Sequence, residues 1–249
     1  MGKAGEFNPP KVKAACDKAL ADLLDGLDRE HYPASLYALL RKVLFPGEGA
    51  LRATALLTAV VSSYRGIPQV EGYIMAAQEM LLRGWLLQSV FVSVKLESGN
   101  DGLARKISAE HSEALVLLAA DNLFTLPFEI LASRGGDKAV EVAGRFSENF
   151  GPDGLLQNLD RTGETLEAFL NENSLPALAA AAIPDLPDCY AFGVLARYCW
   201  LREARDWFGR EQPVRCGLAG ALDRRDCLGL DANSPPGSIY MALYRHLGK

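Results

Sequence analysis

Apolar residues recur at every third or fourth position along most of the chain, which is the spacing of amphipathic α-helices. One such series is Leu20, Leu23, Leu24 and Leu27, and the next is Leu36, Leu39, Leu40, Val43 and Leu44. Turn-forming proline and glycine clusters separate the series at residues 9–10, 33, 46–47, 66–68, 98–102, 135–136, 151–152 and 184–187. Helices of roughly 12 to 30 residues joined by short turns follow from this spacing. The pattern predicts an all-α bundle.

Three of the expected helices, around residues 70–95, 104–133 and 187–209, are apolar on more than one face. Helices of this kind bury most of their surface, so we expect them at the centre of the bundle. Between residues 210 and 237, turn formers and charges interrupt any period, and we expect an irregular segment there. We predict a disordered leader over residues 1–9 and a single helical domain over residues 10–249, because one core is common at this size.

Composition and charge argue against several kinds of main partner. The chain of 249 residues is 49% hydrophobic and 23% charged, as globular proteins are, and its net charge is -5. This charge disfavours nucleic acid and anionic membranes as main partners, because both attract basic surfaces. We see no apolar run of the roughly 20 residues that span a bilayer, and no signal-peptide core. The five cysteines lack Cys-x-x-Cys spacing, which favours reduced thiols. These observations predict a cytoplasmic protein without a transmembrane segment.

Common catalytic patterns are incomplete. Residues 47–49 read Gly-Glu-Gly before a helix, but the lysine and the spacing of a nucleotide-binding P-loop are absent. Glu110, His111 and Glu113 lie close together in sequence, as ligands of a metal site would; we interpret them instead as surface ion-pairing residues. The residues by themselves therefore predict no metal site.

Five segments, in order along the chain, carry the patterns of one family. Residues 36–57 are similar to a helix-turn-helix with a Gly-Gly-Lys-Arg-x-Arg-Pro signature, and residues 79–94 to a helix that carries Asp-Asp-x-x-Asp. Residues 111–131 resemble an Ala-Ile-Leu-Ala-Gly-Asp-x-Leu helix, residues 156–160 resemble Gly-Gln-x-x-Asp, and residues 190–209 fit the helix of a second aspartate motif. Together they resemble the trans-isoprenyl diphosphate synthase (polyprenyl synthetase) family. The resemblance implies an isoprenoid synthase-like helical bundle around a central apolar cavity, here C-terminally shortened.

The residues with which that family binds magnesium and diphosphate are mostly replaced. The positions of its aspartates are here Ser89, Val90, Ser93, Ala204, Arg205 and Phe208. Glu203 and Asp206 lie one residue away from the second motif, so a shifted register would restore a carboxylate pair. Among the cations of the first signature only Arg52 remains, and we interpret it as part of a surface salt bridge. The candidate substrate-binding residues that the resemblance implies are Arg52, Gln88, Gln157 and Asp160, with no catalytic residue and no metal ligand.

The replacement of these metal- and diphosphate-binding residues limits the reactions that the chain can catalyse. Mg²⁺ takes oxygen ligands, chiefly carboxylates, and ionising an allylic diphosphate needs such metals to absorb the charge on the leaving group. Valine and alanine provide no such ligand. We therefore expect no cofactor and no efficient condensation of prenyl diphosphates by the chain alone.

Three hypotheses of function follow. In the first, the chain is a pseudoenzyme: a non-catalytic subunit or modulator of an active prenyl synthase in isoprenoid biosynthesis, or a self-associating dimer. In the second, it is a diverged prenyltransferase that works with Mg²⁺ and surviving acids, namely Glu79, Asp121, Asp160, Glu203 or Asp206. In the third, its cavity holds a prenyl chain or another lipid without chemistry. Turnover, altered products of a partner synthase, or recovered lipid would distinguish the three.

Overall fold

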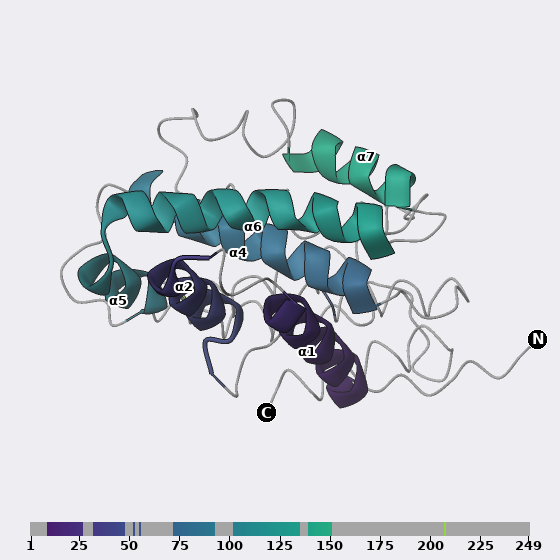
Figure 1. Cartoon of the computed structure of the whole chain (residues 1–249), viewed down its shortest axis with the longest axis horizontal. Helices are drawn as coiled ribbons and strands as arrows, with labels where there is room; N and C mark the ends of the chain where they lie inside the picture. The colour runs from purple at the N-terminus through teal and green to yellow at the C-terminus, as the bar shows by residue number, and fades with distance from the viewer. Residues whose placement is uncertain are drawn as a thin grey trace, which may run out of the picture.

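The computed structural model is a bundle of α-helices (Figure 1). It describes residues 9–26, 32–47, 52, 55, 72–92, 102–134, 139–150 and 207. The helices are α1 (Pro9–Gly26), α2 (Ala34–Leu44), α4 (Gly72–Val92), α5 (Leu103–Glu110), α6 (Glu113–Arg134) and α7 (Ala139–Phe150). No strand occurs within these ranges. The predicted all-α class is thereby confirmed.

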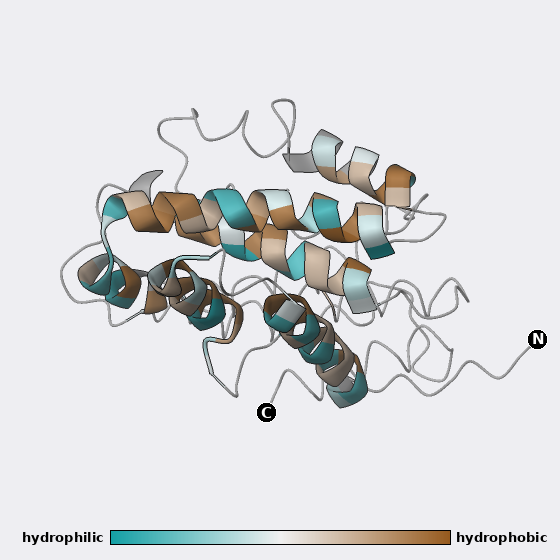
Figure 2. Ribbon diagram, viewed as in Figure 1, coloured by the Kyte–Doolittle hydropathy of each residue, from teal (hydrophilic) through white to brown (hydrophobic). Residues whose placement is uncertain are grey.

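Helices α4 and α6 form the centre of the bundle and pack along each other (Figure 1). Helix α1 packs on α4, α2 contacts both central helices, and α7 lies against the opposite side of α6 (Figure 1). Figure 2 shows hydrophobic residues over much of α4 and α6, whereas the outward side of α1 is largely hydrophilic. The expectation that the apolar helix around 70–95 lies centrally is confirmed.

The central helices approach each other closely at Gly84. A Cβ atom built on this residue would lie 3.0 Å from the Cβ of Leu123 and 3.2 Å from the carbonyl oxygen of Ala120. Both distances are shorter than ordinary van der Waals contact between such atoms, which lies near 3.5–4.0 Å. The missing side chain of Gly84 therefore sets how closely α4 and α6 pack.

The expectation of one continuous helix around 104–133 is wrong, because the chain breaks between α5 and α6. His111 is extended, with φ -129° and ψ 147°. Ser112 begins the next helix: its carbonyl accepts a bond from the Val116 amide at 3.1 Å, and its hydroxyl oxygen lies 3.4 Å from the Leu115 amide nitrogen. Serine followed by an acidic residue is a helix-start signal. No glycine or proline marks the break, and the apolar residues recur on both sides of it. The sequence pattern therefore did not reveal that the helix is interrupted.

Helix α6 is long and strongly apolar. Its 22 residues have a mean hydropathy of 1.6 in the most apolar window, so by length and composition it is the one helix in the described ranges that could cross a bilayer. The same test is passed by core helices of soluble proteins. Eight of its side chains are buried against the rest of the bundle, namely Val116, Ala119, Ala120, Leu123, Leu126, Pro127, Ile130 and Leu131.

Several expectations fall outside the described ranges. Pro9, which we assigned to the leader, is already the first residue of α1. Trp207 is helical and buried, as expected for a central helix, but the rest of the expected helix 187–209 lies outside the described residues. So do the expected irregular segment 210–237 and the rest of the division into leader and single domain.

Candidate functional site

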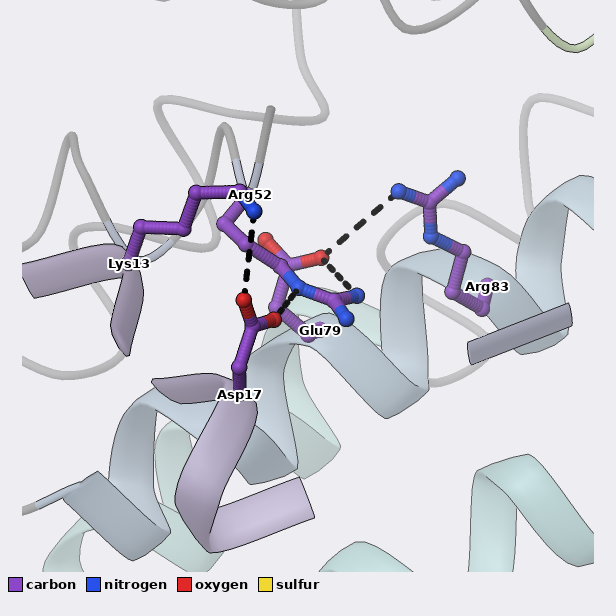
Figure 3. Close-up of polar contacts among 5 residues, drawn as sticks. All are labelled: Lys13, Asp17, Arg52, Glu79 and Arg83. Carbon is purple, nitrogen blue, oxygen red and sulfur yellow. Dashed lines mark hydrogen bonds and ion pairs between the residues drawn. The ribbon is translucent and has the colours of Figure 1, made fainter. Parts of the chain in front are cut away.

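Five charged side chains form a continuous row between α1, Arg52 and α4, which we call the charge cluster (Figure 3). From α1, Lys13 Nζ lies 3.2 Å from Asp17 Oδ2, and Asp17 Oδ1 accepts a hydrogen bond of 2.6 Å from Arg52 Nε. From α4, Glu79 Oε2 lies 3.8 Å from Arg52 Nη1 and 3.9 Å from Arg83 Nη2. Cations and anions therefore alternate along the row.

The inner part of the charge cluster is removed from water. Arg52 and Glu79 are 0% exposed and Arg83 is 2% exposed, whereas the side chain of Asp17 remains 30% exposed. An isolated charge in such a place costs several kcal/mol or more, so each member requires a partner of opposite sign. The interpretation of Arg52 as part of a surface salt bridge is therefore wrong: it pairs in the interior.

Local sequence explains part of this geometry. Lys13 and Asp17 on α1, and Glu79 and Arg83 on α4, each stand four residues apart, so both pairs share one helix face. Arg52 is not positioned by helical spacing. Its backbone adopts φ 57°, a left-handed conformation that is unfavourable for a residue with a Cβ and persists only when surrounding contacts hold it.

Arg52 is held by more than its ion pairs. Its guanidinium lies 5.2 Å from the centre of the Phe45 ring, within the range of a cation–π contact. Burial opposes the charge of Arg52, but the nearby carboxylates of Glu79 and Asp17 outweigh it, so the pKa of Arg52 is raised. The Arg52 side chain is therefore charged and contacts both the carboxylates and the Phe45 ring.

Cys16 lies next to Asp17 on α1 and is fully buried. Burial, and then the negative charge of Glu79, raise the pKa of the Cys16 thiol well above its usual value. The thiol therefore stays protonated in the folded chain across neutral pH.

A pH effect follows from Cys16. In the unfolded chain the thiol has a pKa near 8.5, and below this pH Cys16 makes its full contribution to the free energy of unfolding. Above this pH the thiol ionises in the unfolded chain only. The free energy of unfolding then falls by about 1.4 kcal/mol per pH unit, until the pH reaches the higher pKa of the folded chain. We expect Cys16→Ala to remove this fall. Urea unfolding of both proteins at pH 7, 9 and 10 measures it, since all other titrating groups are shared. Parallel curves for wild type and variant would contradict the assignment.

Of the four candidate substrate-binding residues, the structure describes Arg52 and Gln88 and does not bring these two together. Gln88 lies on α4, nine residues after Glu79 and hence about 13 Å along the helix axis. Its Oε1 is buried and has no hydrogen-bond partner within the described ranges. Ser89 and Val90 follow on the same helix, but nothing is described of their side chains. The other predicted positions lie outside the described residues: Ser93, Gln157, Asp160, Ala204, Arg205 and Phe208.

The remaining acids within the described ranges do not gather. Asp121 is exposed on α6. Glu110 pairs with Lys42 of α2, which lowers the pKa of Glu110, and it lies 4.0 Å from His111 Nε2. The interpretation of Glu110 as a surface ion-pairing residue is confirmed. No group of three or more His, Cys, Asp or Glu side chains that could hold a metal occurs in the part of the chain that the structure describes.

Sequence reasoning missed most of the charge cluster. Lys13, Asp17 and Arg83 were not singled out, although a signal was present for Arg83. Glu79 and Arg83 stand at helical spacing inside an otherwise apolar stretch, where both would be buried and would need each other. No comparable signal points from Asp17 to Arg52, which lie 35 residues apart.

A small pocket lies between α1, α4 and α6. Its volume is about 100 Å³, and it is lined mainly by apolar side chains, with Glu129, Ser133 and Arg134 adding polar groups. Arg134 donates a hydrogen bond of 3.0 Å to the Tyr73 hydroxyl and lies over its ring. The pocket therefore combines an apolar lining with a polar edge.

Comparison with known proteins shows the fold. No protein-family model and no curated protein matches the sequence. Among solved structures, a geranyltransferase from Legionella pneumophila matches with TM-score 0.59 and 16% identity over 96% of this chain and 94% of its own. A geranyltransferase from Helicobacter pylori matches with 0.57 and 19% over 98% and 99%. The small subunit of geranyl diphosphate synthase from Antirrhinum majus matches with 0.51 and 15% over 96% and 99%.

At these identities the likeness shows the fold alone, and it agrees with the fold that the sequence resemblance implied. The matches span 94% or more of each of these three chains.

Proposed function

We propose that this chain, which has the fold of the trans-isoprenyl diphosphate synthases, is a non-catalytic subunit or modulator of an active prenyl synthase. The observation that carries the proposal is the state of Arg52. It is the one cation of the diphosphate signature that the sequence keeps, and it is buried and neutralised by Asp17 and Glu79. A side chain held in this way supports the architecture rather than a substrate.

The chemistry of the motif positions supports the same proposal. Cleavage of an allylic diphosphate places negative charge on the leaving group, and metal-held carboxylate sites absorb that charge. At the first motif the chain offers Ser89, Val90 and Ser93, of which valine has no ligand atom at all. A chain with this fold that lacks those metal ligands keeps the surfaces by which it packs, and a non-catalytic subunit would use such surfaces to contact its partner synthase.

The fold is compatible with such a role, because one matched structure is a small subunit of a geranyl diphosphate synthase, from Antirrhinum majus. For the chain described here, a partner subunit remains our proposal. The partner we expect is a prenyl synthase encoded in the same genome.

The test has two parts. The purified chain, incubated with Mg²⁺ and labelled allylic and homoallylic diphosphates, is expected to give no more elongated product than buffer does. Co-expressed with the synthase of the same genome, it is expected to co-elute with that synthase and to change the length distribution of its products. The matched control adds heat-denatured chain to the same synthase.

The outcomes separate the hypotheses. Turnover by the chain alone would show a diverged enzyme instead. Absence of co-elution together with unchanged products would exclude the subunit role.

The lipid-binding hypothesis gains no support from the pocket between α1, α4 and α6. Its volume of about 100 Å³ is smaller than the roughly 150 Å³ of an engineered cavity that accepts benzene. A ten-carbon prenyl chain is larger than benzene and does not fit there.

A further inference from the structure

We propose that the exposed face of α6 binds a second copy of this chain, with the two α6 helices packed antiparallel. The contact is a row of exposed residues, which we call the α6 stripe: Ala114, Leu118, Asp121, Thr125, Phe128 and Ala132. The proposal concerns the purified chain alone, so its failure and the failure of the proposed subunit role are distinguishable.

The α6 stripe has the heptad spacing with which two helices pack side by side. Its members stand alternately four and three residues apart, so they form one row along the helix. The eight buried side chains of α6, which pack against the rest of the bundle, all lie outside this row. Helix α6 therefore has one face for the bundle and a separate exposed face.

The exposed face is strongly apolar. Leu118 is 47% exposed and Phe128 is 36% exposed, and the neighbouring Leu117 is 38% exposed. Within the α6 stripe only Asp121 carries a charge. The exposed side of a surface helix is normally rich in charged and polar residues. A contiguous apolar patch on such a surface commonly marks a contact with another molecule.

The order of residues in the α6 stripe points to a second copy as that molecule. From either end the row reads small, then large and apolar, then polar, with its midpoint at the level of residue 123. A two-fold axis at this midpoint makes every contact occur twice, because residue i then meets j and j meets i. The resulting pairs are Ala114 with Ala132, Leu118 with Phe128, and Asp121 with Thr125. Each residue thus meets one of matching size or polarity.

Charge sets the direction of pairing. In a parallel pair the two Asp121 carboxylates would face each other directly, and adjacent like charges on helices are destabilising. In the antiparallel pair each Asp121 faces the uncharged Thr125. The two carboxylates then stand four residues apart along the helix axis, which is about 6 Å. The antiparallel arrangement is therefore favoured.

Phe128 is held in place before any partner binds. Its ring packs edge-to-face on the buried Phe146 of α7, with 6.5 Å between the ring centroids. A rigid, partly exposed aromatic side chain loses little conformational entropy on association. Phe128 is thus suited to anchor the contact with Leu118 of the second copy.

The first test is sedimentation equilibrium of the purified chain over a range of concentrations. A single pair of helices buries a small area, so we expect a monomer–dimer equilibrium with a dissociation constant on the order of 10 µM. Leu118→Lys buries a charge in the contact and is expected to weaken it about tenfold or more. The matched control is Ala14→Lys, which adds the same charge at an exposed position of α1 and should leave the equilibrium unchanged.

A second variant tests the antiparallel register. Phe128→Glu alone is expected to weaken association as Leu118→Lys does. When the two changes are combined in one chain, each new lysine faces a new glutamate, and association is expected to recover to within about threefold of wild type. A parallel pair would instead bring lysine against lysine, and the combined variant would stay monomeric.

Cross-linking decides the register even if Phe128→Glu does not fold. Disulfides form between residues whose Cα atoms lie within about 7 Å. Asp121→Cys mixed with Thr125→Cys is therefore expected to give more covalent dimer on oxidation than either variant alone or wild type. Equal yields from the mixture and the single variants would overturn the proposal.

Two other results would also overturn it. One is a wild-type chain that stays monomeric at every concentration, and the other is a dimer that Leu118→Lys leaves intact. If the monomeric chain bound the synthase of the same genome and Leu118→Lys abolished that binding, the occupant of this face would be the synthase and not a second copy.

Discussion

Replacing Glu79 by glutamine is expected to lower the free energy of unfolding by about 3–5 kcal/mol, the usual cost of breaking a buried ion pair on one side. Glu79 is 0% exposed and is the carboxylate shared by Arg52 and Arg83. Without its charge, Arg83 loses the ion-pair partner that α4 provides, and Arg52 keeps Asp17 alone. Urea unfolding followed by circular dichroism measures the change.

Two further variants test the origin of this loss. Glu129→Gln removes the same charge from an exposed position on α6 and is expected to change stability by no more than about 0.5 kcal/mol. Glu79→Leu combined with Arg83→Met replaces the pair by apolar residues and should recover much of the loss, because two buried charges are then removed together. A loss below about 1 kcal/mol for Glu79→Gln would show that the charge cluster does not hold α1, Arg52 and α4 together.

Gly84→Leu is expected to destabilise the chain by about 3 kcal/mol or more, at the upper end of the usual cost of overpacking. The first atom of the new side chain would already lie 3.0 Å from Leu123 Cβ and 3.2 Å from the backbone oxygen of Ala120. A backbone oxygen in a helix cannot turn aside, so α4 and α6 would have to separate. Thermal and urea unfolding measure the effect.

The control for this prediction is Gly144→Leu in α7. Nothing lies within 4 Å of a Cβ built on Gly144, and the residue is exposed. Leucine favours helix over glycine by roughly 0.8 kcal/mol, so Gly144→Leu is expected to stabilise slightly. Equal effects at the two glycines would mean that helix propensity, not close packing of α4 on α6, determines the result.

The charge cluster also shows which features of a site can be predicted from sequence and which cannot. The pair of Glu79 and Arg83 is encoded locally, because opposite charges four residues apart on an apolar helix are buried together. Arg52 was recognised as the retained cation of its motif, yet its environment was not, because no local pattern indicates that residue 52 is buried or that its partner is on α1. The approach of Asp17 to Arg52 depends on how α1 packs against α4.

By itself, the sequence determined the helical class of this protein, the central place of the helix around 70–95 and the absence of carboxylates at Ser89, Val90 and Ser93. These properties are local: they depend on the period of apolar residues and on side-chain chemistry at single positions. Only the tertiary structure decided that Arg52 is buried between Asp17 and Glu79, and that Gly84 sets the contact of α4 with α6. Both depend on distances between segments far apart in the chain, which arise when the helices pack and water is excluded.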